Sequence, residues 1–250
     1  MEHIAAIGFD LFNTLITAHD GALDEAFKRL AMSLEESGLA LEREGFRQAY
    51  REAAVRFIEE TRKEGLETHN RFWISAALRT QGYTVGPDDP MIAQAVEHYF
   101  SAFFEYCHPI PGTLEMLKTL KDRYQLGLLS NFTHGPAARG IIEHLGLASF
   151  FDVILISGEL GYCKPHPMVF DRLAEDMRVE KSRLVYIGDE PVLDVQGAMQ
   201  AGIQPVWTTI VVDKKIPYTP GTPQGQTQLP EGPIPRISSW NDFLSLLKSK

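Results

Sequence analysis

Six side chains of this 250-residue sequence could together carry nucleophilic, metal-assisted chemistry, because each follows a short apolar segment and carries a carboxylate, a hydroxyl, an amide or an ammonium group. They are Asp10, Ser130, Asn131, Lys164, Asp189 and Asp194. Neighbouring carboxylates repel one another unless a cation compensates their charge. A hard dication with oxygen ligands would do so. The sequence therefore indicates a metal-dependent reaction centre if the fold brings these residues together.

Short apolar segments, each followed by a polar or glycine-containing turn, predict buried parallel strands. They cover residues 4–9, 126–129, 153–156, 184–187 and 205–207. Helical patterns are found at residues 113–123, 136–145, 167–177 and 192–201. This alternation predicts an α/β fold with a Rossmann-like, doubly wound parallel sheet. In such a sheet ligands bind beyond the carboxyl ends of the strands, where these six side chains are expected.

Residues 18–106 break the alternation of strands and helices. Their apolar residues recur at helical spacing, and glycines divide the segment into about four helices. We therefore predict an α/β core made of residues 1–17 and 107–250, with an all-helical domain of residues 18–106 inserted into it. The aromatic side chains of the insertion are expected to form its own core rather than a cofactor site.

The last part of the chain changes in composition. Residues 213–235 are rich in Pro, Gly, Gln and Thr and have no periodicity, which predicts a long surface loop or a partly disordered segment. A final strand at residues 236–237 and a helix at 241–247 are expected to complete the fold.

Charge and cysteine content limit the classes of partner. The formal net charge of -9 argues against binding to nucleic acid or to anionic membranes. Cys107 and Cys163 are far apart and form no CxxC pair, so neither a disulfide scaffold nor a zinc site is expected. No signal sequence and no apolar run of membrane-spanning length is found, so a cytoplasmic location is expected. No pattern indicates an oligomeric state.

Four short motifs carry a resemblance to a known family. They are the segment Asp10-Leu11-Phe12-Asn13-Thr14-Leu15 after the first strand, Ser130-Asn131, Lys164-Pro165, and Gly188-Asp189 followed by Asp194. In this order and register they resemble the haloacid dehalogenase (HAD) superfamily. The resemblance extends over nearly the whole chain, because the helical insertion corresponds to the cap domain of that superfamily.

The resemblance implies a role for each motif. Asp10 would be the nucleophile, forming an ester or acyl-phosphate intermediate that water hydrolyses. Lys164 would neutralise the charge that develops between Asp10 and the substrate. The transferred group would be bound by Thr14, Ser130 and Asn131. A Mg²⁺ cofactor would be held by Asp10, Asp189 and the backbone carbonyl of Phe12, with Asp194 in support.

Phe12 departs from the pattern of the phosphatases in this superfamily. Phosphatases of this superfamily usually carry a second Asp at this position. That Asp protonates the leaving group, a role that contributes about 10²–10⁴-fold in rate. An aromatic residue there resembles the 2-haloacid dehalogenase branch, in which the Asp attacks carbon without a metal. Asp189 argues against that branch, because the branch has a Ser/Asn motif at this position and no metal carboxylate.

Three functions therefore remain open. The favoured one is a Mg²⁺-dependent phosphatase acting on a small phosphorylated metabolite; the others are a metal-independent 2-haloacid dehalogenase and a weakly catalytic, ligand-binding member. If a proton donor replaces the missing acid, the candidates are His19, Asp20, His166 and Glu190. Polar residues of the insertion that could reach a substrate are Arg43, His69, Asn70 and Arg71. Each of these residues could equally belong to a solvated turn or helix face.

Overall fold

A computed structural model describes residues 3–219 and 234–248 of the chain. Its centre is a six-stranded sheet in the order β5-β4-β1-β6-β7-β8, with every pair parallel. The strands are β1 (Ala6–Phe9), β4 (Gln125–Ser130), β5 (Val153–Ile156), β6 (Leu184–Gly188), β7 (Gln204–Thr208) and β8 (Arg236–Ile237). The chain builds the sheet outward in both directions from β1. The predicted doubly wound α/β fold is confirmed.

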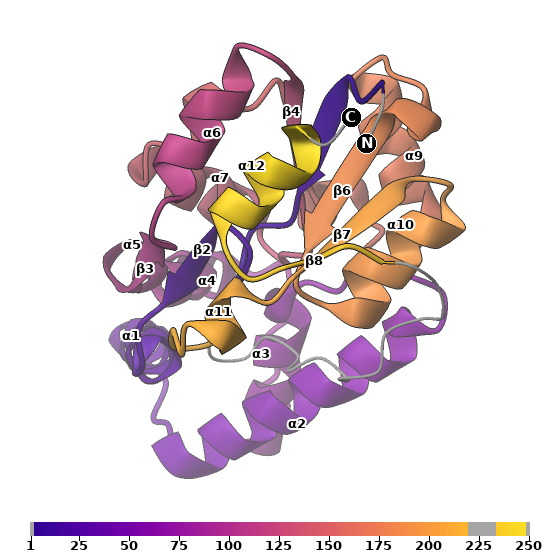
Figure 1. The fold of residues 1–250 in the computed structure, drawn as a ribbon. Helices are drawn as coiled ribbons and strands as arrows, with labels where there is room; N and C mark the ends of the chain where they lie inside the picture. Colours follow the sequence, from indigo (N-terminus) through magenta and orange to yellow (C-terminus); the bar gives the residue numbers. More distant parts are fainter. Residues whose placement is uncertain (1–2, 220–233, 249–250) are drawn as a thin grey trace.

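Helices cover both faces of the sheet (Figure 1). Side chains that alternate along each strand explain this, because successive residues point to opposite faces. In β1, Ile7 and Phe9 belong to one apolar cluster, while Ala6 belongs to the other. The first cluster includes α6 (Thr113–Lys121), α7 (Gly135–His144) and α12 (Trp240–Lys248). The second includes α9 (Pro167–Asp176) and α10 (Gly197–Gln200).

Five helices lie between two short strands that pair with each other. The strands β2 (Ile16–Ala18) and β3 (Cys107–Pro109) form an antiparallel ribbon. Between them lie α1 (Ala22–Glu36), α2 (Arg43–Arg62), α3 (Asn70–Thr80), α4 (Pro90–Ser101) and α5 (Phe103–Tyr106), hereafter the helical insertion. Strands of three residues are too short to show a periodic pattern, so the sequence did not predict the ribbon. Figure 1 shows the insertion lying beyond one end of the sheet.

The helix expected at residues 192–201 differs from the structure. A π-helix, η3 (Pro191–Gln196), comes first and is followed by α10. Glu190 begins it: its carboxylate accepts hydrogen bonds from the backbone N–H groups of Val192 and Leu193, both at 2.6 Å. Single π turns are frequent at functional sites. Here the turn carries Asp194.

Short elements complete the connections: η1 (Ala148–Phe150), α8 (Ser157–Leu160), η2 (Lys181–Arg183) and α11 (Ile210–Asp213). The segment predicted as a loop from residue 213 is described up to Thr219, and residues 220–233 lie outside the described part. Within that described part, no helix has the length and apolarity that crossing a bilayer requires.

The C-terminal helix α12 is joined to the first strand by aromatic packing. The ring of Phe9 meets Phe151, Trp240 and Phe243 edge-to-face at centroid distances of 6.3, 6.5 and 6.3 Å.

We expect Phe243→Ala to lower the free energy of unfolding by about 3–5 kcal/mol, because the side chain is fully buried and its removal leaves a cavity. Urea denaturation measures this. Val212→Ala, at a residue 67% exposed, is the control and should change stability little; equal losses would contradict the packing.

Candidate active site

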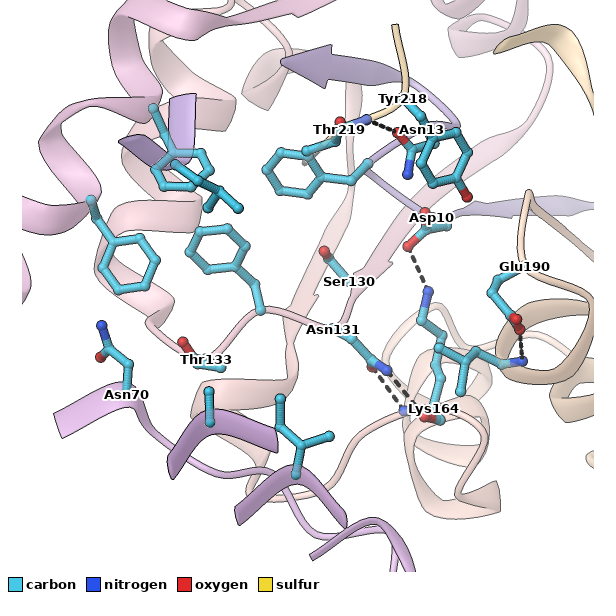
Figure 2. Close-up of a pocket in the computed structure, with 18 of the residues that line it drawn as sticks. Asp10, Asn13, Asn70, Ser130, Asn131, Thr133, Lys164, Glu190, Tyr218 and Thr219 are labelled. Carbon is cyan, nitrogen blue, oxygen red and sulfur yellow. Dashed lines mark hydrogen bonds and ion pairs between the residues drawn. The ribbon is translucent and has the colours of Figure 1, made fainter. Parts of the chain in front are cut away.

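The carboxyl ends of three adjacent strands bring the site residues together. Asp10 directly follows β1, Ser130 ends β4, and Asp189 directly follows β6. Since β1 lies between β4 and β6 in parallel register, these three residues emerge side by side at the same edge of the sheet. Lys164 reaches the same edge from the loop between α8 and α9. Figure 2 shows Asp10, Ser130, Asn131 and Lys164 facing one cavity.

Lys164 is a buried ammonium group held by carboxylates. Its Nζ atom lies 2.5 Å from Oδ1 of Asp10, 2.7 Å from Oδ1 of Asp194 and 3.0 Å from the hydroxyl of Tyr186. Burial alone would lower the pKa of Lys164, but the charges of Asp10 and Asp194 raise it well above its usual value. The side chain therefore stays charged at neutral pH.

The carboxylates outnumber that single positive charge. Oxygens of Asp10, Asp189 and Asp194 all lie within 4.8 Å of one another. Burial, opposed by Lys164 and reinforced by Asp194, raises the pKa of Asp10 to about 6. Burial, together with the charges of Asp10 and Asp194, also raises the pKa of Asp189 well above its usual value. A dication would relieve this repulsion, and a set of carboxylate oxygens fits the ligand preference of Mg²⁺.

Glycine at position 188 lets Asp194 enter the cluster. A Cβ atom there would lie 2.2 Å from Cγ of Asp194, closer than any side chain tolerates. With Gly188, Asp194 places Oδ1 on Lys164 and accepts a hydrogen bond from the backbone N–H of Glu190 on Oδ2 at 3.0 Å. Both oxygens of Asp194 are thus engaged within the protein, which fits a supporting position rather than a central one.

Two of the residues expected at the transferred group have their polar side-chain atoms bonded to other protein groups, although Asn131 also lines the cavity. Asn131 donates from Nδ2 to the backbone carbonyl of Lys164 at 3.0 Å, and its Oδ1 accepts from the Lys164 N–H at 2.8 Å. Thr14 is fully buried, and its hydroxyl donates to Oδ1 of Asp189 at 3.3 Å. Ser130 lines the cavity directly. Asn131 therefore fixes the loop of Lys164, and Thr14 orients Asp189.

Residues 217–219 belong to the segment predicted as a surface loop, and they form no helix or strand, with Pro217 exposed; unlike a plain surface loop, however, Tyr218 and Thr219 reach the site. The hydroxyl of Tyr218 donates to Oδ2 of Asp189. The N–H of Thr219 donates to Oδ1 of Asn13 at 2.8 Å (Figure 2). The hydroxyl of Thr17 in β2 donates to the carbonyl of Pro217 at 2.6 Å. The one available signal was an aromatic residue, Tyr218, within a Pro- and Gly-rich stretch.

A cavity of about 570 Å³ extends from the carboxylates into the helical insertion. Both parts of the chain contribute aromatic rings to its wall: Phe12, Tyr50, Trp73, Tyr99, Phe100, Phe103 and Phe132. The Phe12 ring stacks on Phe132 with a centroid distance of 5.6 Å and an interplanar angle of 9°. Phe12 therefore forms apolar wall where the phosphatase pattern has an acid.

None of the four candidate proton donors has a carboxyl or imidazole group free at the cavity. His19 and Asp20 are exposed and do not line it. His166 accepts the N–H of Met168 at the start of α9. Glu190 lines the cavity, but its carboxylate is the one that accepts two backbone N–H groups of η3.

The four polar candidates of the insertion also differ in placement. Asn70, fully buried, lines the cavity. Arg43 is paired with Glu35 on the surface, and Arg71 is paired with Asp88 at 2.9 Å. His69 accepts the N–H of Arg71 on Nδ1 at 3.2 Å and so begins α3.

The helical insertion contacts the core beside Lys164. Backbone bonds join Cys163 N–H to the Gly65 carbonyl at 2.9 Å and Glu67 N–H to the Gly161 carbonyl at 3.0 Å. The Ser157 hydroxyl donates to the Glu67 carboxylate and accepts the N–H of Phe132 at 2.8 Å. The loop that carries Lys164 is therefore held by both parts of the chain.

Comparison with known proteins identifies the family. A family model described as haloacid dehalogenase-like hydrolase matches residues 4–202. The chain is 29% identical over 201 residues to the glyceraldehyde 3-phosphate phosphatase of Methanopyrus kandleri, covering 80% of this chain and 82% of that protein. It is 31% identical over 113 residues to pyrimidine 5'-nucleotidase YjjG of Escherichia coli, covering 44% of this chain and 49% of that protein.

Among solved structures, a 2-haloacid dehalogenase from Pseudomonas syringae pv. Tomato DC3000 is similar with a TM-score of 0.72 and 23% identity, covering 98% of each chain. That likeness shows a shared fold. The family match over most of the chain shows more: this protein belongs to the haloacid dehalogenase-like hydrolases and is a hydrolase. The resemblance drawn from the four motifs is confirmed.

A half-buried histidine, His69, at the contact between insertion and core gives a pH test. The His69 ring meets His134 at a centroid distance of 5.3 Å, and His134 Nε2 lies 3.2 Å from Glu97. Burial, followed by the positive charges of His134 and Arg71, lowers the pKa of His69 to about 4. As the pH falls, His69 in the unfolded chain becomes protonated near pH 6.5, whereas His69 in the folded protein stays neutral to a lower pH.

We therefore expect the wild type to lose unfolding free energy relative to His69→Asn as the pH falls from 7 to 5. Asn keeps an N-cap acceptor but has no proton to bind. Urea denaturation of both proteins across this range measures the difference. Parallel pH profiles would show that His69 is protonated as readily in the folded protein as in the unfolded one.

Proposed function

We propose that this hydrolase is a Mg²⁺-dependent phosphatase that acts on a small phosphorylated substrate with Asp10 as nucleophile. The observation that carries the proposal is the cluster of three carboxylates around one ammonium group, since this excess of negative charge calls for a dication. Phosphatase and nucleotidase names among the relatives support it. The second Asp of the phosphatase pattern is absent, and Phe12 stands in its place.

Asp10, Asp189 and the backbone carbonyl of Phe12 would hold the metal, and Asp194 would support it. When bound, Mg²⁺ neutralises negative charge on the phosphoryl oxygens. Thr14 and Tyr218 each bind an oxygen of Asp189, so its carboxylate is oriented before any metal arrives.

The reaction would proceed by two displacements at phosphorus. In the first, an Asp10 carboxylate oxygen forms a bond to phosphorus while the bond to the ester oxygen of the leaving group breaks. In the second, water attacks the same phosphorus, the bond to Asp10 breaks, and the proton of the water leaves with phosphate or to solvent. Asp10 is regenerated as a carboxylate.

Lys164 and Ser130 would bind the transferred phosphoryl group. The ammonium group of Lys164 already donates a hydrogen bond to Asp10. In the transition state it would also stabilise the negative charge on the phosphoryl oxygens. Ser130 lines the cavity next to Asp10 and offers a hydroxyl donor. Asn131 would act through Lys164, whose backbone it holds from both sides.

Dehalogenation is the second candidate, and Phe12 is the observation that favours it. An apolar ring beside the nucleophile suits an attack on carbon, where no leaving-group proton is needed. Asp189 opposes this function, because an uncompensated carboxylate near Asp10 would repel a carboxylate substrate. The two functions differ in their need for metal.

Hydrolysis of p-nitrophenyl phosphate tests the proposal. We expect turnover with Mg²⁺, its loss on addition of EDTA, and a fall of at least about 10³-fold in kcat for Asp10→Asn, because the nucleophile is removed. Asp20→Asn makes the same chemical change at an exposed residue and should keep full activity. Release of chloride from 2-chloropropionate in EDTA, without phosphatase activity, would instead establish the dehalogenase function.

Tyr218 gives a test that does not depend on turnover. We expect Tyr218→Phe to weaken Mg²⁺ binding by about 10–100-fold, because Asp189 loses the hydroxyl that orients it. Isothermal titration calorimetry with Mg²⁺ measures the affinity directly. Tyr83→Phe is the matched control, since its hydroxyl bonds Ala40 within the insertion. Equal Mg²⁺ affinity of wild type and Tyr218→Phe would show that Tyr218 does not contribute to metal binding.

A further inference from the structure

The residues that line the cavity indicate the chemical character of the leaving group, the part of the substrate that is released from phosphorus. Eleven of its lining residues come from the helical insertion, and among them only Arg51 and Asn70 are not apolar or aromatic: Leu23, Tyr50, Arg51, Ala54, Val55, Ile58, Asn70, Trp73, Tyr99, Phe100 and Phe103. The core adds Phe12 and Phe132 on the side of Asp10. A polyhydroxylated leaving group would lose most of its hydrogen bonds to water here, because among these eleven residues only Arg51, Asn70 and the tyrosine hydroxyls are polar, and every hydroxyl left unpaired has a cost.

Aromatic rings gather where the leaving group would lie. Phe132 is in contact with Phe12, Phe100 and Phe103, at centroid distances of 5.6, 5.1 and 6.3 Å. Tyr50 packs edge-to-face on Trp73 at 5.9 Å. A flat ring fits such a wall, because stacked and edge-to-face contacts between rings add to the burial of apolar area.

Among the described residues, neither position 12 nor Glu190 offers the leaving oxygen a carboxylic acid. Position 12 carries a ring, and the carboxylate of Glu190, which also lines the cavity, accepts two N–H groups of η3. A general acid contributes about 10²–10⁴-fold when the leaving group is an ordinary alcohol. It contributes little when the leaving group is stable as an anion.

Building on the phosphatase function proposed above, we propose that the substrate is an aryl phosphate: a phosphate ester of an acidic hydroxyl on an apolar ring. The bond between phosphorus and the ester oxygen breaks as Asp10 attacks, and the ring leaves as its phenolate with the electron pair of that bond. No proton transfer accompanies this step. Phe12 thus serves as a specificity-determining residue that contacts the ring.

Two substrates of matched shape test the inference. Phenyl phosphate and benzyl phosphate both carry one apolar ring, but phenol is far more acidic than benzyl alcohol. We expect kcat/KM of the wild type with Mg²⁺ to be at least about 10²-fold higher for phenyl phosphate, the size of a missing general acid. It should also rise steeply along a series of phenyl phosphates with increasingly acidic phenols, and glycerol 2-phosphate should be the poorest substrate.

Substitutions at Phe12 separate its two roles. Phe12→Asp should raise kcat/KM for benzyl phosphate relative to phenyl phosphate, because it supplies the missing acid. Phe12→Leu stays apolar and should keep the wild-type ratio of the two substrates. Circular dichroism and thermal unfolding check that each variant is folded, and the wild-type substrate series stands without either variant.

The outcomes distinguish this inference from the function on which it rests. No Mg²⁺-dependent hydrolysis of any phosphate ester, p-nitrophenyl phosphate included, would overturn the phosphatase function itself. Hydrolysis of p-nitrophenyl phosphate together with equal kcat/KM for phenyl and benzyl phosphate would leave that function standing and overturn the inference, since the enzyme must then supply a proton. A higher kcat/KM for glycerol 2-phosphate than for phenyl phosphate would overturn it as well.

Discussion

One buried positive charge organises this molecule. Lys164 is 3% exposed, and its ammonium group is stable there only because Asp10 and Asp194 lie within 2.7 Å of it. Several features of the core serve that contact. Gly188 leaves room for Asp194, and Asn131 fixes the backbone of Lys164. Breaking the pair from one side would leave a buried charge uncompensated, which explains why elements far apart in the sequence must meet at this point.

The core and the helical insertion line different ends of the cavity. The core provides charge at one end, where bonds to the transferred group would form and break, and the helical insertion provides an apolar wall for the remainder of the substrate. Backbone contacts between residues 65–67 and 161–163 place that wall next to Lys164. Changes of side chain in the insertion can therefore alter the apolar wall without disturbing the charged cluster.

Phe12 favours dehalogenation and Asp189 favours metal-dependent phosphate hydrolysis. The contacts of each residue show how both can belong to one site. Phe12 is part of a continuous aromatic wall through its stack on Phe132. Asp189 sits among other carboxylates and is oriented by Thr14 and Tyr218, an arrangement that a cation would stabilise. An apolar wall and a metal site are compatible when the leaving group is both apolar and acidic.

The sequence by itself determined the parallel sheet, because continuous apolar segments followed by polar turns have few other structures available, and it located Asp10, Ser130 and Asp189 at strand ends. Only the tertiary structure decided which atoms these residues meet. The pairing of Asn131 with Lys164 spans 33 positions, and that of Tyr218 with Asp189 spans 29. The ribbon of β2 and β3 and the approach of residues 217–219 leave no periodic signal, because long-range contacts rather than local preference hold them in place.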